Sequence, residues 1–196
     1  MFPHTGDLQP WEITKDLSNI IFKKIQELSD DFFIKDGIAI HKTAKVEDRA
    51  ILKAPIIISE NCCIGANAYL RNGVYLGHST SIGPACEVKT SIIFDHTEIA
   101  HLNFIGDSII GSNINFEAGS ITANYFNERA DKTISVLFNS QVLKTAAEKF
   151  ASLVGDNCKI GANAVLSPGT ILTPGTIVKR LELIEQIGVG TTANKH

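Results

Sequence analysis

Two groups of side chains in this sequence have the types and the spacing to do chemistry. Arg71 and Lys89 are 18 residues apart, and their guanidinium and ammonium groups both bind phosphate or carboxylate well. His78, His96 and His101 follow one another at intervals of 18 and five residues. An imidazole titrates near neutral pH and can take up a proton, and three imidazoles together can hold a zinc ion. Either group predicts a site if the fold brings residues 18 positions apart side by side.

A six-residue repeat supplies such a fold. Apolar side chains recur at every sixth position, and most residues two places before them are small. This period fits neither an α-helix nor an alternating strand, and it indicates short parallel strands joined by tight turns. We expect a mainly β fold, a left-handed parallel β-helix with three hexapeptides in each coil, in which Arg71 and Lys89 stack about 4.8 Å apart. The series is Ile40, Val46, Leu52, Ile58, Ile64, Leu70, Leu76, Ile82, Val88 and Phe94, followed later by Ile110, Phe116 and Thr122 and by Val154, Ile160, Leu166, Leu172 and Val178.

The register of this repeat changes between Phe94 and Ile110. Counting forward from Phe94 places Gly106 in the interior, whereas counting back from Ile110 places Phe104 there. The predicted slip is therefore four residues long and includes His101. Irregularities of this kind often re-aim side chains next to a functional site.

The segments around the repeat predict three regions. Residues 1–34 form an N-terminal cap with a helix over residues 10–29, whose apolar face we expect to close the open first coil. Residues 35–180 form the β-helix domain, in which residues 126–150 break the repeat as a charged loop with a short helix over residues 141–150. Residues 181–196 form a tail whose Gly/Thr-rich end we expect to be disordered.

Composition excludes several classes of function. The 196 residues carry a net charge of −3, so no electrostatic footprint for nucleic acid is present. No apolar run is long enough to span a bilayer, and the start lacks a signal pattern, so we expect a cytoplasmic protein without a membrane or nucleic-acid partner. The four cysteines form no CxxC pair, and three of them occupy the small-residue position of the repeat, so we expect reduced core side chains.

Three stretches carry a more specific resemblance. Residues 87–89 read EVK, residues 101–107 read HLNFIGD and residues 115–125 read NFEAGSITANY. They resemble the acetyltransferase domain of bifunctional glucosamine-1-phosphate acetyltransferase/UDP-N-acetylglucosamine pyrophosphorylases. Residues 149–163, KFASLVGDNCKIGAN, resemble archaeal-type sugar-1-phosphate nucleotidylyltransferase/acetyltransferases. The resemblance covers about residues 35–180 and implies a homotrimer that transfers the acetyl group of acetyl-CoA to an amino-sugar phosphate similar to glucosamine-1-phosphate, at sites between subunits.

The resemblance also implies a role for each matching residue. His101 matches the catalytic histidine, which we expect to act as a general base. Arg71 and Lys89 match the phosphate-binding residues, Phe104, Asn115, Asn124 and Tyr125 match the sugar-binding residues, and Ser167 and Pro168 lie along the expected path of CoA.

This chain departs from the pattern of the family at three points. The family has a tyrosine where this chain has Phe104, so a hydroxyl that would help to hold the sugar phosphate is absent. A family lysine after Tyr125 has no clear counterpart, and Arg129 or Lys132 are candidates to replace it. No uridylyltransferase domain precedes the β-helix, so we expect the second activity to be missing and a separate nucleotidylyltransferase to be a candidate partner.

Three other functions fit the same residues. The Phe104 change favours a different acceptor, such as a nucleotide-linked amino sugar. His78, His96 and His101 have spacings that fit a metal site similar to that of γ-class carbonic anhydrases, if one histidine comes from a neighbouring subunit. The β-helix could also be a non-catalytic scaffold or a regulatory partner. We favour the acyltransferase without a bound metal, because the metal site gives Arg71 and Lys89 no role.

Overall fold

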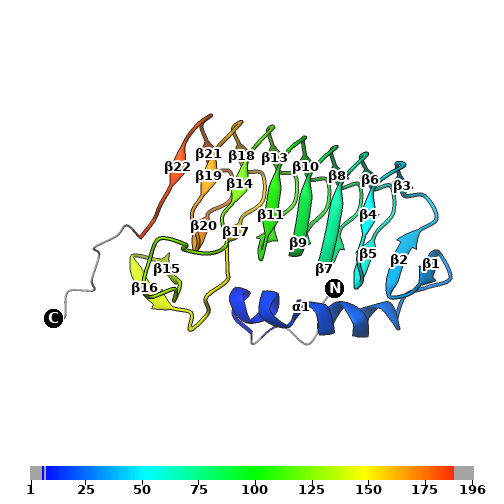
Figure 1. Ribbon diagram of the computed structural model, residues 1–196, viewed down its shortest axis with the longest axis horizontal. Helices are drawn as coiled ribbons and strands as arrows, with labels where there is room; N and C mark the ends of the chain where they lie inside the picture. Colours follow the sequence, from blue (N-terminus) through cyan, green and yellow to red (C-terminus); the bar gives the residue numbers. More distant parts are fainter. Residues whose placement is uncertain (1–5, 7, 188–196) are drawn as a thin grey trace.

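The computed structural model describes residue 6 and residues 8–187 of the chain. Its body is a parallel β-helix with three sides, beside which lie one long helix and one separate hairpin (Figure 1). The predicted fold class, a mainly β protein of stacked hexapeptide coils with an N-terminal helix, is confirmed.

Each coil runs along a first side, then a second and then a third, and equivalent strands of successive coils pair in parallel. The first side consists of β2 (Ile38–His41), β5 (Ile56–Ile58), the later parts of β7 (Tyr69–Leu76) and β9 (Glu87–Ile93), β12 (Ile109–Ile110), β17 (Ser152–Val154) and β20 (Thr170–Leu172). The second side consists of β3 (Lys45–Val46), β6 (Cys63–Ile64), β8 (Ser81–Ile82), β10 (Glu98–Ile99), β13 (Asn115–Phe116), β18 (Lys159–Ile160) and β21 (Ile177–Val178). The third side consists of β4 (Ile51–Leu52), the earlier parts of β7 and β9, β11 (Phe104–Gly106), β14 (Ile121–Thr122), β19 (Val165–Leu166) and β22 (Leu183–Ile184).

The interior of the β-helix differs from the predicted series at two positions. Ile93, not Phe94, is fully buried inside the coils, and Ile105, not Phe104, is buried in the same core. Phe94 instead packs outside the coils, in the apolar cluster beneath the helix. Phe104 lies on the outer face of the third side and is partly buried. The two counts across the slip, which place either Gly106 or Phe104 in the interior, therefore both miss the core residue by one position.

The predicted four-residue slip is divided between two short steps. Val88 and Ile93 are five residues apart, as are Ile105 and Ile110, and each step turns from the third side to the first. His101 lies between Ile99 and Ile105, where the spacing is the ordinary six, so the slip does not pass through the histidine. Each of these two corners is shortened by one residue, and the loss of two residues from a six-residue repeat is the same register change as a slip of four.

Helix α1 (Pro10–Ile25) lies along the outer face of the first side (Figure 1). It begins at Pro10 as predicted, after a capping box formed by Gln9 and Glu12, and it ends four residues before the predicted residue 29. Leu17, Ile21 and Ile25 are buried against the outward residues of the first side, which are apolar: Ala39, Ile57, Tyr75, Ile92 and Ile109. The helix therefore covers a side of the prism, and the prediction that it closes the first coil is wrong. Strand β1 (Phe32–Lys35) pairs antiparallel with β2 at that edge instead.

Residues 126–150 contain a β-hairpin where a loop with a short helix was predicted. β15 (Ser135–Phe138) pairs antiparallel with β16 (Gln141–Lys144), and the turn residues Asn139 and Ser140 have φ values of 47° and 62°. Two left-handed residues are what a type I′ hairpin turn requires, and the start of the predicted helix, residues 141–144, is strand β16. The segment is attached to α1 through Phe150, whose ring meets Trp11 edge-on at 6.0 Å.

The coils continue beyond the predicted boundary at residue 180, because β22 pairs in parallel with β19. Residues 188–196, which include most of the predicted disordered tail, lie outside the described residues. Within the part of the chain that the structure describes, no helix has both the length and the apolar character needed to cross a membrane.

The four cysteines are free thiols, and Cys62, Cys86 and Cys158 are buried. Burial raises the pKa of the Cys62 thiol to about 11, so this group stays protonated at neutral pH. These three side chains fill the small-residue position of the coils, as the sequence predicts.

A single glycine allows α1 to approach the corner between the third and first sides. Gly73 has a φ of 90°, and a β-carbon at this position would lie 3.0 Å from the backbone nitrogen of Ser18 on the helix. It follows two residues after Arg71, within an irregularity of the β7–β9 pairing. The bulge and the missing side chain together make room for the helix.

We expect Gly73→Ala to lower the free energy of unfolding by about 3 kcal/mol, because the change adds backbone strain and a contact with Ser18. Gly175→Ala is the matched control, because Gly175 also has a positive φ of 76° but no described atom within 4 Å of an added β-carbon. This control measures the cost of backbone strain alone, which we expect to lower the free energy of unfolding by about 1 kcal/mol. Urea unfolding followed by circular dichroism measures both, and equal losses would contradict the role of Gly73 in seating the helix.

Candidate functional site

The corner where the third side meets the first side carries polar side chains in successive coils; we call it the 3–1 corner. Arg71 on β7 and Lys89 on β9 are register partners there, so the prediction that they stack one coil apart is confirmed. Asp107 follows in the next coil, where its backbone N–H donates to the Lys89 carbonyl at 3.0 Å. The corner therefore places two cations and a carboxylate on neighbouring coils.

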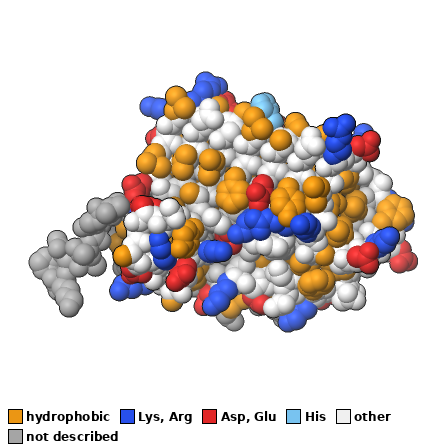
Figure 2. All heavy atoms as spheres, viewed as in Figure 1, with side chains coloured by type: hydrophobic (Ala, Val, Ile, Leu, Met, Phe, Trp, Pro, Cys, Tyr) orange, Lys and Arg blue, Asp and Glu red, His pale blue; other side chains and the backbone are white. Residues whose placement is uncertain are grey.

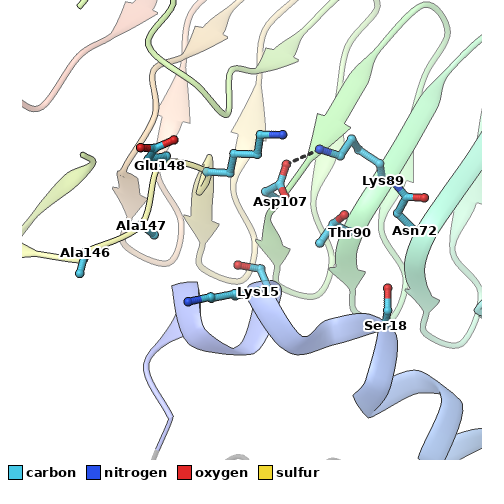
Figure 3. A pocket seen from close by; sticks show the side chains of 11 residues that line it. Lys15, Ser18, Asn72, Lys89, Thr90, Asp107, Ala146, Ala147 and Glu148 are labelled. Atoms are coloured by element: carbon cyan, nitrogen blue, oxygen red, sulfur yellow. Dashed lines mark hydrogen bonds and ion pairs between the residues drawn. The ribbon is translucent and has the colours of Figure 1, made fainter. Parts of the chain in front are cut away.

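Lys89 forms a nearly buried ion pair. Its Nζ lies 2.7 Å from Oδ2 of Asp107, and the two side chains are only 10% and 9% exposed. Figure 3 shows the pair at the edge of a cavity. The side-chain amide of Asn124 donates to the same carboxylate oxygen. Asp107 thus joins two of the predicted substrate-binding residues, Lys89 and Asn124.

Arg71 is also paired with a carboxylate. Its Nη2 and Nε lie 2.6 Å and 2.8 Å from Oε1 of Glu87, and both side chains are about one third exposed. The guanidinium lies 5.6 Å from the centre of the Tyr69 ring. Since neighbouring cations repel, the two carboxylates explain how Arg71 and Lys89 can be stacked on adjacent coils.

Phe104 belongs to the same group of side chains. It is the register partner of Glu87, and Gly106 is the partner of Lys89. A β-carbon at Gly106 would lie 2.7 Å from Cζ of Phe104 and 3.4 Å from Nδ2 of Asn124, so the phenyl ring occupies the space over Gly106. The structure therefore brings together four of the predicted residues: Arg71, Lys89, Phe104 and Asn124.

His101 lies at the other end of the third side, where the second side meets it. The side chain is exposed, and it makes no hydrogen bond or ion pair with any other described residue. The backbone below it is fixed, because its carbonyl accepts hydrogen bonds of 3.1 Å from Gly119 N–H and from the Asn103 side-chain amide. Strand β11 leads from this corner to Asp107 at the 3–1 corner, and Phe104 lies between the two ends.

Asn115 lies on the second side, away from the four grouped residues. Its amide donates to Glu98 at 3.2 Å. It borders a groove of about 590 Å³ whose lining includes Lys159, Lys179 and Arg180. The guanidinium of Arg180 binds Glu117 with two hydrogen bonds and holds the pKa of that carboxyl below its ordinary value.

Tyr125 follows Asn124 and is 38% exposed. Lys132 lies over its ring at 5.1 Å, whereas Arg129 stacks on Phe126 and pairs with Glu185 at 3.3 Å. Lys132 is thus the cation that accompanies Tyr125.

Ser167 and Pro168 lie at the 3–1 corner of a later coil. The Ser167 carbonyl accepts hydrogen bonds from both the N–H and the hydroxyl of Thr170. The next residue, Gly169, abuts Ser135 of the hairpin. The 3–1 corner lies opposite the second side of the prism, so Ser167 and Pro168 are far from the groove beside Asn115.

The histidines are divided between two corners. His78 and His96 stack as predicted where the first side meets the second, with ring centres 5.0 Å apart, and Nδ1 of His78 lies 2.8 Å from Glu60. His101 lies at a different corner of the chain. Among the described residues, no three His, Cys, Asp or Glu side chains are grouped so as to hold a metal ion.

Sequence reasoning did not identify Asp107, although a signal for it was present. Arg71, Lys89 and Asp107 are separated by 18 residues each, so a count of 18 points to Asp107, although the shortened coil makes Gly106 the register partner of Lys89 and places Asp107 one residue further along. Lys15 on α1 and Lys149 near the end of the hairpin segment also line the cavity at the 3–1 corner. No repeat relates these two lysines to the corner, so only the tertiary structure identifies them.

The Lys89–Asp107 pair predicts the effect of removing one partner. We expect Asp107→Asn to lower the free energy of unfolding by about 3 kcal/mol, because it leaves the Lys89 ammonium nearly buried without a carboxylate. Glu117→Gln, which breaks the exposed pair with Arg180, is the control and should change stability little. Thermal and urea unfolding measure both effects, and a neutral Asp107→Asn would contradict this account of the corner.

Comparison with known proteins supports the repeat and the resemblance. The family described as "Hexapeptide repeat of succinyl-transferase" matches residues 55–83 and 153–178. A bifunctional sugar-1-phosphate nucleotidylyltransferase/acetyltransferase of Sulfurisphaera tokodaii is 29% identical over 111 residues, which cover 54% of this chain and 28% of that protein. The bifunctional protein GlmU of Clostridium kluyveri is 37% identical over 79 residues, which cover 40% of this chain and 16% of that protein.

One solved structure supports the fold alone. A Desulfovibrio desulfuricans protein described as an acetyltransferase has a TM-score of 0.52 at 15% identity, over 85% of this chain and 30% of that one. The predicted resemblance is thus confirmed: the chain carries the hexapeptide repeat and is similar to bifunctional nucleotidylyltransferase/acetyltransferases, of whose length it spans less than a third.

Proposed function

We propose that this protein is an acyltransferase that moves the acetyl group of acetyl-CoA to the amine of a sugar phosphate similar to glucosamine-1-phosphate. The similarity to bifunctional acetyltransferases supports the reaction class. The observation that carries the proposal is the grouping of four predicted residues on the third side, along which β11 runs from the corner of His101: Arg71, Lys89, Phe104 and Asn124.

The acceptor lies across the third side in this proposal. The phosphate binds at the 3–1 corner, where Lys89 and Arg71 are stacked. The sugar covers Phe104, which presents an apolar ring in place of a hydroxyl, and the Asn124 amide is close enough to Phe104 to reach the same ring of the sugar. The amine then points along β11 toward His101.

His101 acts as the general base. The neutral imidazole takes a proton from the amine as its nitrogen attacks the thioester carbon, so that the N–C bond forms and the C–S bond breaks. The thiolate of CoA leaves and receives the proton. The exposed imidazole has no described side-chain partner to compete for the proton, and its fixed backbone limits its movement.

The donor has a candidate place on the second side. The groove beside Asn115 exposes Lys159 and Lys179, which make no ion pair with a described side chain and suit the phosphates of CoA. Ser167 and Pro168, which the resemblance assigns to CoA, lie at the 3–1 corner and stay a prediction. The corner of His101 separates this groove from the third side, so a thioester in the groove could approach the amine there.

Association of three chains completes the proposal. Since α1 covers the first side, the second and third sides remain for contacts between copies. Hydrophobic side chains gather on the face seen in Figure 2. On the third side a register row interrupted only by Glu87 includes Ile51, Ile121 and Leu183, which are 53%, 39% and 59% exposed. Such a row is costly in water and favours a partner surface.

We expect His101→Ala to lower turnover by a factor of about 10² to 10⁴, because general-base catalysis typically contributes that much. Thiol release from acetyl-CoA with glucosamine-1-phosphate as acceptor measures the rate. His96→Ala is the matched control, since His96 lies at another corner, and it should keep the wild-type rate. Unchanged turnover in His101→Ala would overturn the assigned base.

We expect a native mass of about three chains, each of 21.2 kDa, in light scattering. Ile121→Lys should reduce it to one chain, because the ammonium group would be buried in the apolar contact. Val142→Lys, on the exposed hairpin strand β16, should leave the mass unchanged. A monomeric wild-type protein would remove the site between subunits.

A further inference from the structure

A cavity of about 570 Å³ lies where three distant segments of the chain meet at the 3–1 corner (Figure 3). Helix α1 contributes Lys15 and Ser18, and the coils contribute Lys89 and Asp107. Residues 146–149, at the end of the hairpin segment, close the remaining side. The cavity is within the range of small-ligand sites, and it adjoins the cation that the proposed function assigns to the acceptor phosphate.

The positions of the two outer segments are fixed by packing. Trp11, one helical turn before Lys15, meets Phe150, the residue after Lys149, in an edge-on contact. Phe150 is fully buried, and the N–H of Ala151 donates to the Asp107 carbonyl at 3.0 Å. Lys15 and Lys149 are therefore attached to a rigid part of the molecule, although their side chains are exposed at the cavity.

The charges around the cavity are unequally compensated. Lys89 is neutralised by Asp107, and Arg71 on the neighbouring coil is neutralised by Glu87. The side chains of Lys15 and Lys149, in contrast, make no ion pair or hydrogen bond with any residue that the structure describes. The charged residues that line the cavity are three lysines and two carboxylates, so its net charge is +1: Lys15, Lys89, Lys149, Asp107 and Glu148. The uncompensated positive charge that could attract a phosphate to this corner therefore lies on α1 and on the hairpin segment, outside the hexapeptide coils.

We propose that Lys15 and Lys149 bind a phosphoryl group of the ligand in this cavity, together with Lys89. The inference rests on the proposed function for the identity of the ligand, a phosphorylated amino sugar whose ring extends from the cavity toward His101. Two ammonium groups can approach separate oxygens of one phosphoryl group, and the hydroxyl of Ser18 supplies a further donor. The volume exceeds that of one phosphoryl group, so a second phosphoryl group also fits.

Calorimetric titration of the full chain with inorganic phosphate, and separately with pyrophosphate, tests this site without any need for turnover. We expect Lys15→Gln and Lys149→Gln each to weaken binding about tenfold, and the double variant about a hundredfold, because each change removes one charge-assisted contact. Lys23→Gln is the matched control, since Lys23 is an exposed lysine of the same helix that does not line the cavity. Tighter binding of pyrophosphate than of phosphate would assign the cavity to a diphosphate, and equal binding would assign it to a single phosphoryl group.

Wild-type affinity in the double variant would overturn the inference. The acyl-transfer assay then separates it from the proposed function. If both hold, the double variant raises the KM for glucosamine-1-phosphate at least tenfold with little change in kcat, while His101→Ala lowers kcat and leaves phosphate binding intact. Loss of phosphate binding in a protein that transfers no acetyl group would uphold the cavity and reject the proposed reaction. Transfer with an unaltered KM in the double variant would uphold the reaction and reject the cavity.

Discussion

Backbone hydrogen bonding between coils is the constraint on which the rest of this molecule depends. Each strand pairs in parallel with its counterpart one coil away, so the register of the ladder decides which side chains are neighbours on an outer face. Tyr69, Glu87, Phe104 and Ile121 are consecutive partners in this way. The backbone under an outward side chain can be displaced only with its whole coil, because the interior residues beside it are packed against the coils above and below. This rigidity is what a positioned phosphate ligand and a positioned base both require.

The 3–1 corner departs from the regular ladder, and the candidate site lies there. Its two shortened steps place Thr90 and Asp107 at φ values of 47° and 46°, in the left-handed region that costs energy for residues other than glycine. The same steps bring Asp107 against Lys89, where each neutralises the charge of the other. Local strain at this corner is thus accompanied by a buried ion pair and by the docking of α1 through Gly73.

The sequence predicts the parts of this structure that follow from periodicity. A residue pair 18 positions apart stacks where all three corners between the two residues are regular, which is why Arg71 with Lys89 was placed correctly. Between His78 and His96 one corner is shortened, so the register offset on either side of the two histidines is 17 residues, and the two rings meet edge-on. Counting interior positions in steps of six fails at Phe104, because its neighbour Ile105 is also apolar. Only the length of the corner decides which of the two side chains enters the core. The hairpin was predicted as a loop with a helix over residues 141–150, because its turn depends on left-handed conformations of Asn139 and Ser140, which neither residue type enforces. The course of α1, and with it the position of Lys15, depends on an apolar outer face that becomes visible only when the coils are assembled.

The hairpin segment leaves the coils after β14 and rejoins them at β17 without disturbing the ladder, since Ile109 and Leu153 remain register partners across it. The strands at the two ends of the insertion are therefore held by the same backbone hydrogen bonds that they would make if only a short corner joined them. Insertions and deletions between these ends can accumulate through evolution without moving any coil, because loop closure becomes only slowly more costly with length. A lineage built on this scaffold can thus exchange one wall of the cavity, and with it the molecules it accepts, while the stacked coils are inherited unchanged.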